Sequence, residues 1–356
     1  MQKRRKENNM KKKIELKSVL NVLLPLVVAL SVGAIIILCI GENPIAAYAA
    51  LFEGAFDGKL RLGTTLAGFT PLLLTSLAFI VAAKAGAFNV GVEGEVLLGG
   101  IVAAYIGINW TFLPAPLLIL VCFLGAMLVA ALWALIPAFL KAYYDVSEVC
   151  VTILMNSVAL YITNYLVSGP MSAGTTIAES KPVAVTLPKL MMPSALNAGI
   201  FIAIAVTIVM IFILQKTSLG TQIRLVGTNP ANAEYAGINP KHTFIKAMMI
   251  SGALGGIAGT IEVLGVHGAF LNNFAAGLGN NGMLAALIAK SNVFTAPIIS
   301  FFIAVLNSGA MRMQQATNVP KSLIDTITAV FIIFACMELI GNLKKRSAKK
   351  ADKKNS

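Results

Sequence analysis

Residues 84–100 read KAGAFNVGVEGEVLLGG and follow a long apolar run of the chain. Within them, glycines separate the polar and aromatic positions Phe88, Asn89 and Glu93, which precede a short apolar segment. This layout is suited to unwound backbone at membrane depth, with Asn89 and Glu93 pointing into the protein. An ordinary turn after Lys84 would explain the same pattern equally well.

The composition predicts an all-α integral membrane protein. The chain has 356 residues, of which 57% are hydrophobic and 12% are charged, whereas about 25% of the residues in a soluble domain are charged. Its mean hydropathy is +0.82. Most of the net charge of +13 lies in two basic tails, 1–18 and 341–356. Nucleic-acid binding requires a basic face rather than two basic ends, so the tails are better explained as topology signals that can also bind anionic membrane lipid.

The predicted membrane domain, 19–340, contains about ten transmembrane helices, because a bilayer core of about 30 Å needs roughly 20 apolar helical residues. Two segments, Val96–Ile108 and Gly282–Ala289, are short and follow Gly- and Asn-rich stretches, so each could be half of a broken or re-entrant helix. If both are re-entrant, eight crossings remain. The other predicted segments are Val19–Ile40, Leu62–Ala83, Leu117–Leu140, Val149–Val167, Ala198–Leu214, Phe244–Val266, Ala296–Ala310 and Ser322–Ile340.

The distribution of Lys and Arg predicts the orientation of these segments. With an even number of crossings and both tails inside, 22 of the 28 basic residues lie on the cytoplasmic side and six on the opposite side. Because cytoplasmic loops carry the excess of basic residues, we expect both termini in the cytoplasm.

Two loops stand out between the predicted spans. Residues 168–197 contain four prolines and several Ser and Thr, so we expect an irregular exposed loop there. Residues 215–243, on the cytoplasmic side, place Asn229 at a helix N-cap, Pro230 at the first helical position and Gly237 just past the end. This pattern predicts a short capped helix in a cytoplasmic loop.

The sequence favours a transport protein over an enzyme. It contains no phosphate-binding loop, no H-E-x-x-H and no G-x-S-x-G, and its two histidines lie on opposite predicted sides of the membrane, so they cannot share a metal. Residues 277–282 match G-x-G-x-x-G without the strand that a dinucleotide fold requires, and are better explained as the entry to a broken helix. Intramembrane ionisable residues are few, which favours a neutral polar substrate. The candidates are Glu93, Glu95, Glu262, Lys290 and Asp325.

At residues 84–100 the sequence resembles the G-x-F/I-N-I/L-G-V/I-E-G signature of ABC importer permeases of the branched-chain amino acid and ribose type. It is most similar to the nucleoside permeases that work with basic-membrane-protein-type lipoproteins. A second segment, 220–238, reads GTQIRLVGTNPANAEYAGI and is similar to the family's G-x-x-[LI]-R-A-x-G-x-N-P-x-A-A-x-Y-x-G-I. Glu95 departs from the family pattern, since many relatives have Gln or Met there, and this leaves its role open between a cytoplasmic edge and a substrate contact.

The resemblance implies a permease subunit that moves nucleosides across a bacterial-type plasma membrane by alternating access. The implied partners are a second permease subunit, the same or paralogous, an extracytoplasmic substrate-binding lipoprotein and a cytoplasmic ABC ATPase dimer. The ATPase would bind ATP and Mg, and this chain would hold no cofactor and no metal. A permease for ribose or another simple sugar is the alternative, and an ion-coupled secondary transporter is a weaker one.

The resemblance also implies roles for particular residues. In the substrate pathway we expect Asn89 and Glu93 to hydrogen-bond the substrate and Phe88 to stack on it. Asn156 and Asn164, eight residues apart and so on one helix face, are further candidates, although hydrogen bonding between helices explains them as well. The segment Asn229–Gly237 resembles the coupling helix that docks into the ATPase. The coupling residues would be Arg224, Asn229, Pro230, Glu234, Tyr235 and Gly237.

Overall fold

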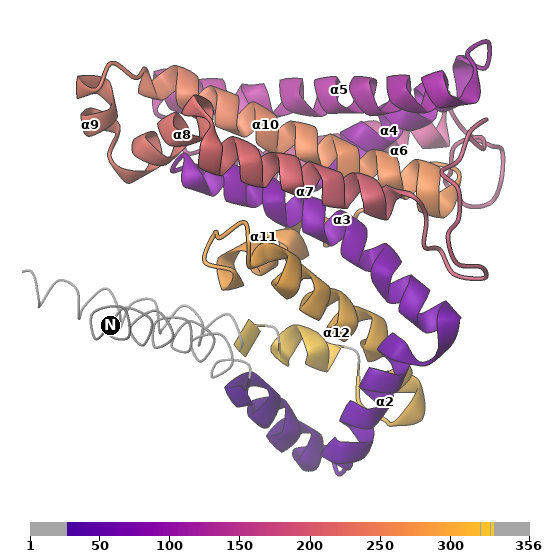
Figure 1. Cartoon of the computed structure of the whole chain (residues 1–356). Helices are drawn as coiled ribbons and strands as arrows, with labels where there is room; N and C mark the ends of the chain where they lie inside the picture. Colours follow the sequence, from indigo (N-terminus) through magenta and orange to yellow (C-terminus); the bar gives the residue numbers. More distant parts are fainter. Residues whose placement is uncertain (1–26, 321, 328, 331–356) are drawn as a thin grey trace, which may run out of the picture. The chain divides into compact units, whose positions relative to one another are not determined.

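The computed structural model describes residues 27–320, 322–327 and 329–330 (Figure 1). Both basic tails, and most of the predicted segment Ser322–Ile340, lie outside the described residues. The chain divides into two compact units, the larger of which, Ala55–Val305, is called the core unit below. The described residues up to Gly54 and from Leu306 onward form the other unit.

The core unit is built from helices in the part of the chain that the structure describes. The long helices α3, α5 and α10 have between 22 and 30 residues each. A π-helix, η1, continues α10 without a break. The elements are α3 (Gly58–Lys84), α4 (Val92–Asn109), α5 (Ala115–Tyr144), α6 (Glu148–Ser168), α7 (Gly199–Lys216), α8 (Ser218–Thr228), α9 (Pro230–Tyr235), α10 (Pro240–Ile261), η1 (Glu262–His267), α11 (Leu278–Ile288) and the first half of α12 (Ala296–Ala316).

Helix α10 lies at the centre of the core unit and contacts α3, α4 and α5. Its glycines allow this close packing, because a methyl group added to Gly259 would lie 2.1 Å from the Val96 carbonyl oxygen of α4. One turn earlier on α10, a methyl group added to Gly256 would lie 2.5 Å from the Ala126 carbonyl oxygen of α5. Small residues three and four apart on a membrane helix let neighbouring backbones approach. The glycine-rich stretch of α10 is therefore a packing surface.

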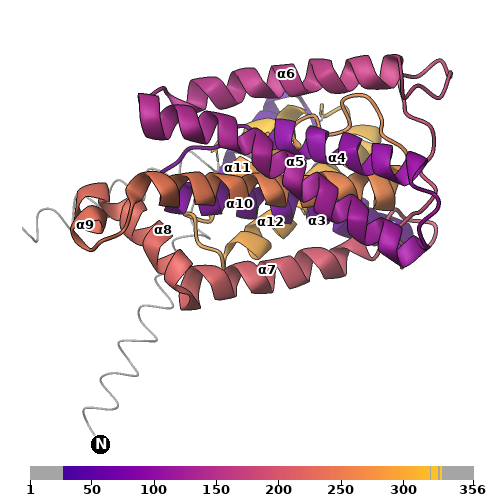
Figure 2. The ribbon, with the colours of Figure 1, turned by 90° about the horizontal axis from the view of Figure 1, so that it is seen from above.

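Helices α6 and α7 lie on opposite sides of this central group (Figure 2). In their most apolar stretches only 22% of the residues of α6 and 28% of those of α7 are buried, compared with 78% for the continuous helix formed by α10 and η1. The exposed positions are large and apolar, for example Leu154 on α6 and Phe201 on α7. Such faces are suited to contact with lipid or with another membrane subunit.

The described residues include seven helices that are long and apolar enough to cross a membrane. A bent pair, Val27–Cys39 and α2 (Pro44–Phe56), raises the count to eight if it forms one span, with a break of 119°. Ten spans and the cytoplasmic position of both termini therefore stay predictions. Helix α4 begins four residues earlier than we expected and is long enough for a span. Helix α11 also begins four residues earlier than expected, but at 11 residues it is short, as predicted. Helix α2 was not predicted.

The loop 168–197 is irregular, as predicted, but it is not simply exposed. Its Ser180 N–H donates to the Phe270 carbonyl at 2.9 Å, and its Leu187 N–H donates to the Leu264 carbonyl at 2.8 Å. Val183 and Leu187 are buried. The prolines prevent regular structure, while the apolar residues between them still pack on the π-helical end of α10.

The second unit, described by itself, is also held by close helix packing. A methyl group added to Gly309 of α12 would lie 2.2 Å from the Leu51 carbonyl oxygen of α2. The Tyr48 hydroxyl donates to the Leu30 carbonyl at 2.7 Å, which ties α2 to the helix Val27–Cys39. The two halves of the bent pair are thus joined by a hydrogen bond beyond the break.

The contact between α4 and α10 can be tested with Gly259→Ala. The new methyl group would meet backbone atoms that cannot rotate away, and overpacking of this kind costs about 1–3 kcal/mol. We expect a lower thermal unfolding midpoint for the purified protein in detergent. Gly68→Ala is the matched control, because an added methyl group there meets nothing within 4 Å. Equal midpoints for the two variants would contradict the packing described here.

Candidate functional site

The chain turns at the end of α3, where the Ala87 N–H donates to the Ala82 carbonyl at 3.0 Å and Gly86 has a φ of +82°, and the rest of the segment 85–91 then dips between helices. Asn89 is fully buried, and its amide nitrogen donates to the Ser251 hydroxyl at 2.9 Å. Ser251 is the twelfth residue of α10, so it lies about 16 Å along that helix from its first residue. Helix α4 therefore starts well inside the bundle and runs about 27 Å to the opposite end.

A second unwound segment enters from the opposite end of the core unit. After η1, residues 268–277 run without regular helix until α11 begins at Leu278. The Gly277 N–H, at the N-cap of α11, donates to the Glu93 carboxyl at 3.2 Å. A methyl group added to Gly279 would lie 2.6 Å from the Glu93 backbone nitrogen. The N-termini of α4 and α11 thus meet at Glu93.

The meeting point lies about as deep along α3 as Ser251 lies along α10. Gly282 of α11 packs against Thr75, with an added methyl group 2.2 Å from its hydroxyl oxygen. Thr75 is nine residues before the end of α3, or about 13 Å along the helix. The two unwound segments enter from opposite ends of the bundle, and the helix N-termini that follow them converge on one carboxyl, an arrangement related to that found at the substrate sites of many transporters. Glu93, in the first turn of α4, supplies the carboxyl that both N-termini favour.

A buried polar cluster of Asn89, Glu95 and Ser251 lies beside the meeting point. The Asn89 amide donates to the Glu95 carboxyl at 2.8 Å, and the Asn89 side-chain oxygen accepts from the Gly91 N–H at 2.9 Å. Glu95 is 1% exposed, and its second carboxyl oxygen has no hydrogen-bond partner. The cluster therefore fixes the conformation of the 85–91 segment and leaves one Glu95 carboxyl oxygen able to accept a further hydrogen bond.

The other residues predicted for the substrate pathway have different surroundings. Phe88 is 38% exposed, and its ring packs edge-on against Phe79 with 4.9 Å between the centroids. The Asn156 amide is committed to backbone, because it accepts from the Gly94 N–H at 2.8 Å and donates to the Val90 carbonyl at 2.9 Å. Asn164 accepts a hydrogen bond from the Ser168 hydroxyl one turn further along α6. Asn89, Glu93 and Asn156 are thus all tied to the start of α4, whereas the ring of Phe88 packs on α3 and Asn164 bonds within α6.

The predicted capped helix is present as α9. The Asn229 side chain accepts from the Asn232 N–H at 3.2 Å, Pro230 is the first helical residue, and Gly237 has a φ of +76°. After the helix the Ile238 N–H donates to the Ala233 carbonyl at 3.0 Å, which completes a Schellman motif. The cap signals in the sequence therefore located this helix correctly.

The remaining predicted coupling residues differ in exposure. Tyr235 is 91% exposed and Glu234 is exposed beside it, so both are available to a partner. The Arg224 guanidinium instead donates to the Leu214 carbonyl at the end of α7 and to the Thr221 hydroxyl. Arg224 thus fixes the junction between α7 and α8.

Helix α8 lies directly against the start of the 85–91 segment. A methyl group added to Gly227 would lie 2.1 Å from the Lys84 carbonyl oxygen and 3.0 Å from the Gly86 nitrogen. Backbone therefore packs on backbone where α3 ends and the unwound segment begins. The 85–91 segment therefore connects the contact with α8, which lies next to α9, to the site at Glu93.

Comparison with known proteins identifies the class. Residues 61–337 match the family model for the permease component of branched-chain amino acid transport systems, and the chain belongs to this family. It is a multi-pass membrane subunit of ABC transport systems and a transport component rather than an enzyme. No group of three or more potential metal ligands occurs among the described residues.

Curated relatives match nearly the whole chain. The guanosine ABC transporter permease NupP of Bacillus subtilis is 32% identical over 92% of this chain and 97% of its own length. The nucleoside permease NupB of Lactococcus lactis is 32% identical over 91% and 92%, and the glucose permease TsgB13 of Haloferax volcanii is 32% identical over 87% and 85%. No solved structure matches the chain.

Sequence reasoning missed two contributors to the site. Ser251 gave no signal beyond its place in a glycine-rich apolar segment. Gly277 was recognised as part of the G-x-G-x-x-G match, but no partner was predicted for it. Their partners, Asn89 and Glu93, are 162 and 184 residues away in sequence. Only the fold brings these residues together.

Asn156→Ala tests whether the α6 amide holds the start of α4. The change leaves the Gly94 N–H and the Val90 carbonyl without their partner, and each buried unsatisfied group costs about 1–3 kcal/mol. We expect substrate uptake per folded transporter to fall at least fivefold and proteolysis within 85–95 to accelerate. Asn164→Ala, the same substitution on the same helix, should keep both values near wild type. Loss of uptake in Asn164→Ala alone would reverse this assignment.

Proposed function

We propose that the chain is the membrane-spanning subunit of an ATP-driven importer for nucleosides, working by alternating access in a bacterial plasma membrane. The observation that carries the proposal is the meeting of two half-helix N-termini at Glu93, in a chain whose full-length relatives include guanosine and nucleoside permeases. The geometry supports a binding site for a polar substrate, and the relatives support the substrate class.

The chemistry at the meeting point suits a neutral polar molecule. Glu93 is half-buried, and its carboxyl can accept hydrogen bonds from sugar hydroxyls or base-edge N–H groups. First-turn N–H groups of α4 and α11 that are released from partners such as Asn156 or Glu93 can donate to hydroxyl or carbonyl oxygens of a substrate. Phe88, with an exposed ring held by Phe79, offers a surface for stacking a base. A nucleoside presents each of these complementary groups.

The segment α8–α9 is proposed to couple this site to ATP hydrolysis. Exposed Tyr235 and Glu234 would contact the cytoplasmic ATPase, and the close contact of Gly227 with Lys84 would transmit the displacement to 85–91. The functional assembly would contain a second permease subunit, two ATPase subunits that bind ATP and Mg, and an extracytoplasmic binding lipoprotein. Its orientation, with both termini and α9 in the cytoplasm, follows the distribution of basic residues.

A simple-sugar permease is the second candidate. The relative that supports it is TsgB13, a glucose permease of similar identity and coverage. Hydroxyl-rich sugars would use the same carboxyl and N–H groups without needing a stacking surface. Competition by free ribose therefore separates the two candidates.

Uptake measurements test the nucleoside proposal. In cells without redundant nucleoside carriers, we expect deletion of this chain to abolish initial uptake of labelled guanosine, adenosine or uridine. Excess unlabelled ribose should leave the uptake of the wild type unchanged. Inhibition by ribose would favour the sugar permease. Collapse of uptake by a protonophore while ATP is maintained would favour an ion-coupled transporter.

Tyr235→Ala tests the coupling surface. Removing the most exposed large side chain of α9 should uncouple the permease from its ATPase, since aromatic anchors dominate protein interfaces. We expect at least a tenfold loss of uptake and of ATPase co-purification, with normal membrane insertion. Tyr165→Ala, at a 71% exposed tyrosine on α6, is the matched control and should stay within twofold of wild type. Equal effects of the two substitutions would remove α9 from the coupling role.

A further inference from the structure

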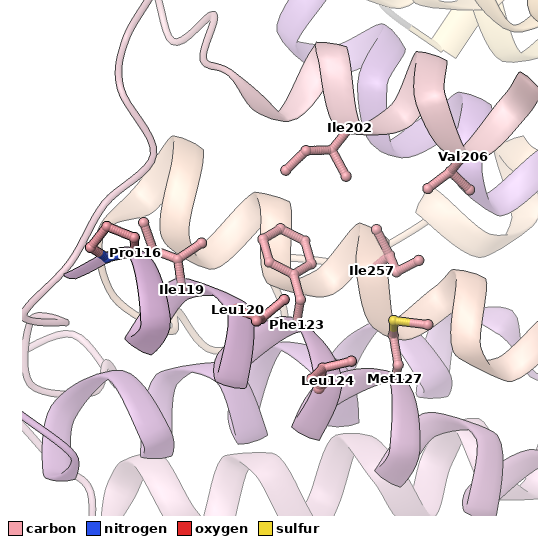
Figure 3. Close-up of a pocket in the computed structure, with 9 residues that line it drawn as sticks. All are labelled: Pro116, Ile119, Leu120, Phe123, Leu124, Met127, Ile202, Val206 and Ile257. Carbon is pink, nitrogen blue, oxygen red and sulfur yellow. The ribbon is translucent and has the colours of Figure 1, made fainter. Parts of the chain in front are cut away.

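An apolar groove lies on the surface of the core unit between α5 and α7 (Figure 3). One wall is formed by Ile119, Phe123 and Met127 of α5, and the other by Ile202 and Val206 of α7. Ile257 of α10 lies at its base. The groove has a volume of about 480 Å³ and is separate from the site at Glu93.

The side of α5 that lines this groove is partly turned away from the core of the unit. Leu120 and Leu124 of α5 are 52% and 54% exposed, and both also line the groove. Because the chain is a multi-pass membrane protein, these faces meet hydrocarbon, and water cannot fill an apolar groove there. The occupant must be an acyl chain or a helix of another subunit.

The length of the groove favours an acyl chain. From Pro116 to Met127 the α5 wall extends 11 residues, or about 16 Å, which is close to half of a 30 Å hydrocarbon core. The groove therefore matches a hydrocarbon chain one leaflet long.

A positive charge lies at the end of the groove where α5 and α7 begin. Lys189 is exposed and forms a backbone bridge with Asn197, whose side chain accepts from the Gly199 N–H at the start of α7. At the same end, Trp110 and Phe112, just before α5, are 40% and 78% exposed. Exposed aromatic rings are typical of the headgroup region of a membrane protein. A lysine at this level can meet a lipid phosphate.

We propose that the groove between α5 and α7 binds one acyl chain of an anionic phospholipid whose headgroup lies at Lys189. The hydrocarbon chain runs from Pro116 toward Met127 and completes the packing of α7 on the core unit. This inference is independent of the transported substrate, since none of the groove residues belongs to the site at Glu93.

Native mass spectrometry of the full-length permease complex tests the proposal, with phosphatidylglycerol and phosphatidylcholine of matched acyl chains as probes. Val206→Trp and Ile119→Trp fill the groove from opposite walls, and each should weaken phosphatidylglycerol binding at least fivefold. Ile208→Trp, at a 61% exposed position on the same helix, is the matched control and should bind as wild type does. Lys189→Gln should remove the preference for phosphatidylglycerol over phosphatidylcholine.

Three results would overturn the proposal. The first is retention of phosphatidylglycerol by both groove-filling variants that elute as intact complexes. The second is an equal loss in Ile208→Trp, which would indicate general annular lipid. The third is an unchanged lipid count together with loss of a subunit in Val206→Trp, which would make the groove a protein interface.

Discussion

The hydrogen bond between the Gly277 N–H and the Glu93 carboxyl marks the constraint on which the rest of the core unit depends. Two helices begin inside the bundle there, and backbone that is unwound at membrane depth must find its hydrogen bonds within the protein. The Asn89 side chain and the Asn156 amide supply them for one segment, and Glu93 does so for the other. The glycines of α10 and α11 then let the backbones approach closely enough for these bonds to form.

This arrangement packs some helices rigidly together and holds the 85–91 segment less tightly. The contact of α10 with α4 and α5 is backbone against backbone, which favours movement of these helices as one body. The segment 85–91 is instead held by side chains from α6 and α10, and it begins at the contact between Gly227 and Lys84. A displacement of α8 by a partner would therefore reach Asn89 and Glu93 directly, which is the structural basis of the proposed coupling.

The sequence predicted elements whose signals are local. The cap residues Asn229, Pro230 and Gly237 located α9, and the Gly- and Asn-rich stretch 277–282 marked the short helix α11, which begins within that stretch at Leu278. The sequence did not predict α2, the π-helix η1 or the partners of Asn89 and Glu93, because these depend on contacts between residues far apart in the chain. The length of the apolar run also underestimated α4, because the run begins at Val96 whereas the helix begins at Val92 and includes Glu93 and Glu95, whose partners lie within the protein.

The central claim is that the meeting point of α4 and α11 is a substrate site within the membrane. Asn280, in the first turn of α11, is exposed beside it, and Asn280→Cys in a chain whose four native cysteines are replaced provides a probe. The measurement is labelling by a water-soluble thiol reagent in the assembled transporter, with and without guanosine. The account predicts labelling that guanosine slows at least threefold while ribose does not. Labelling at the same rate with and without guanosine would contradict it.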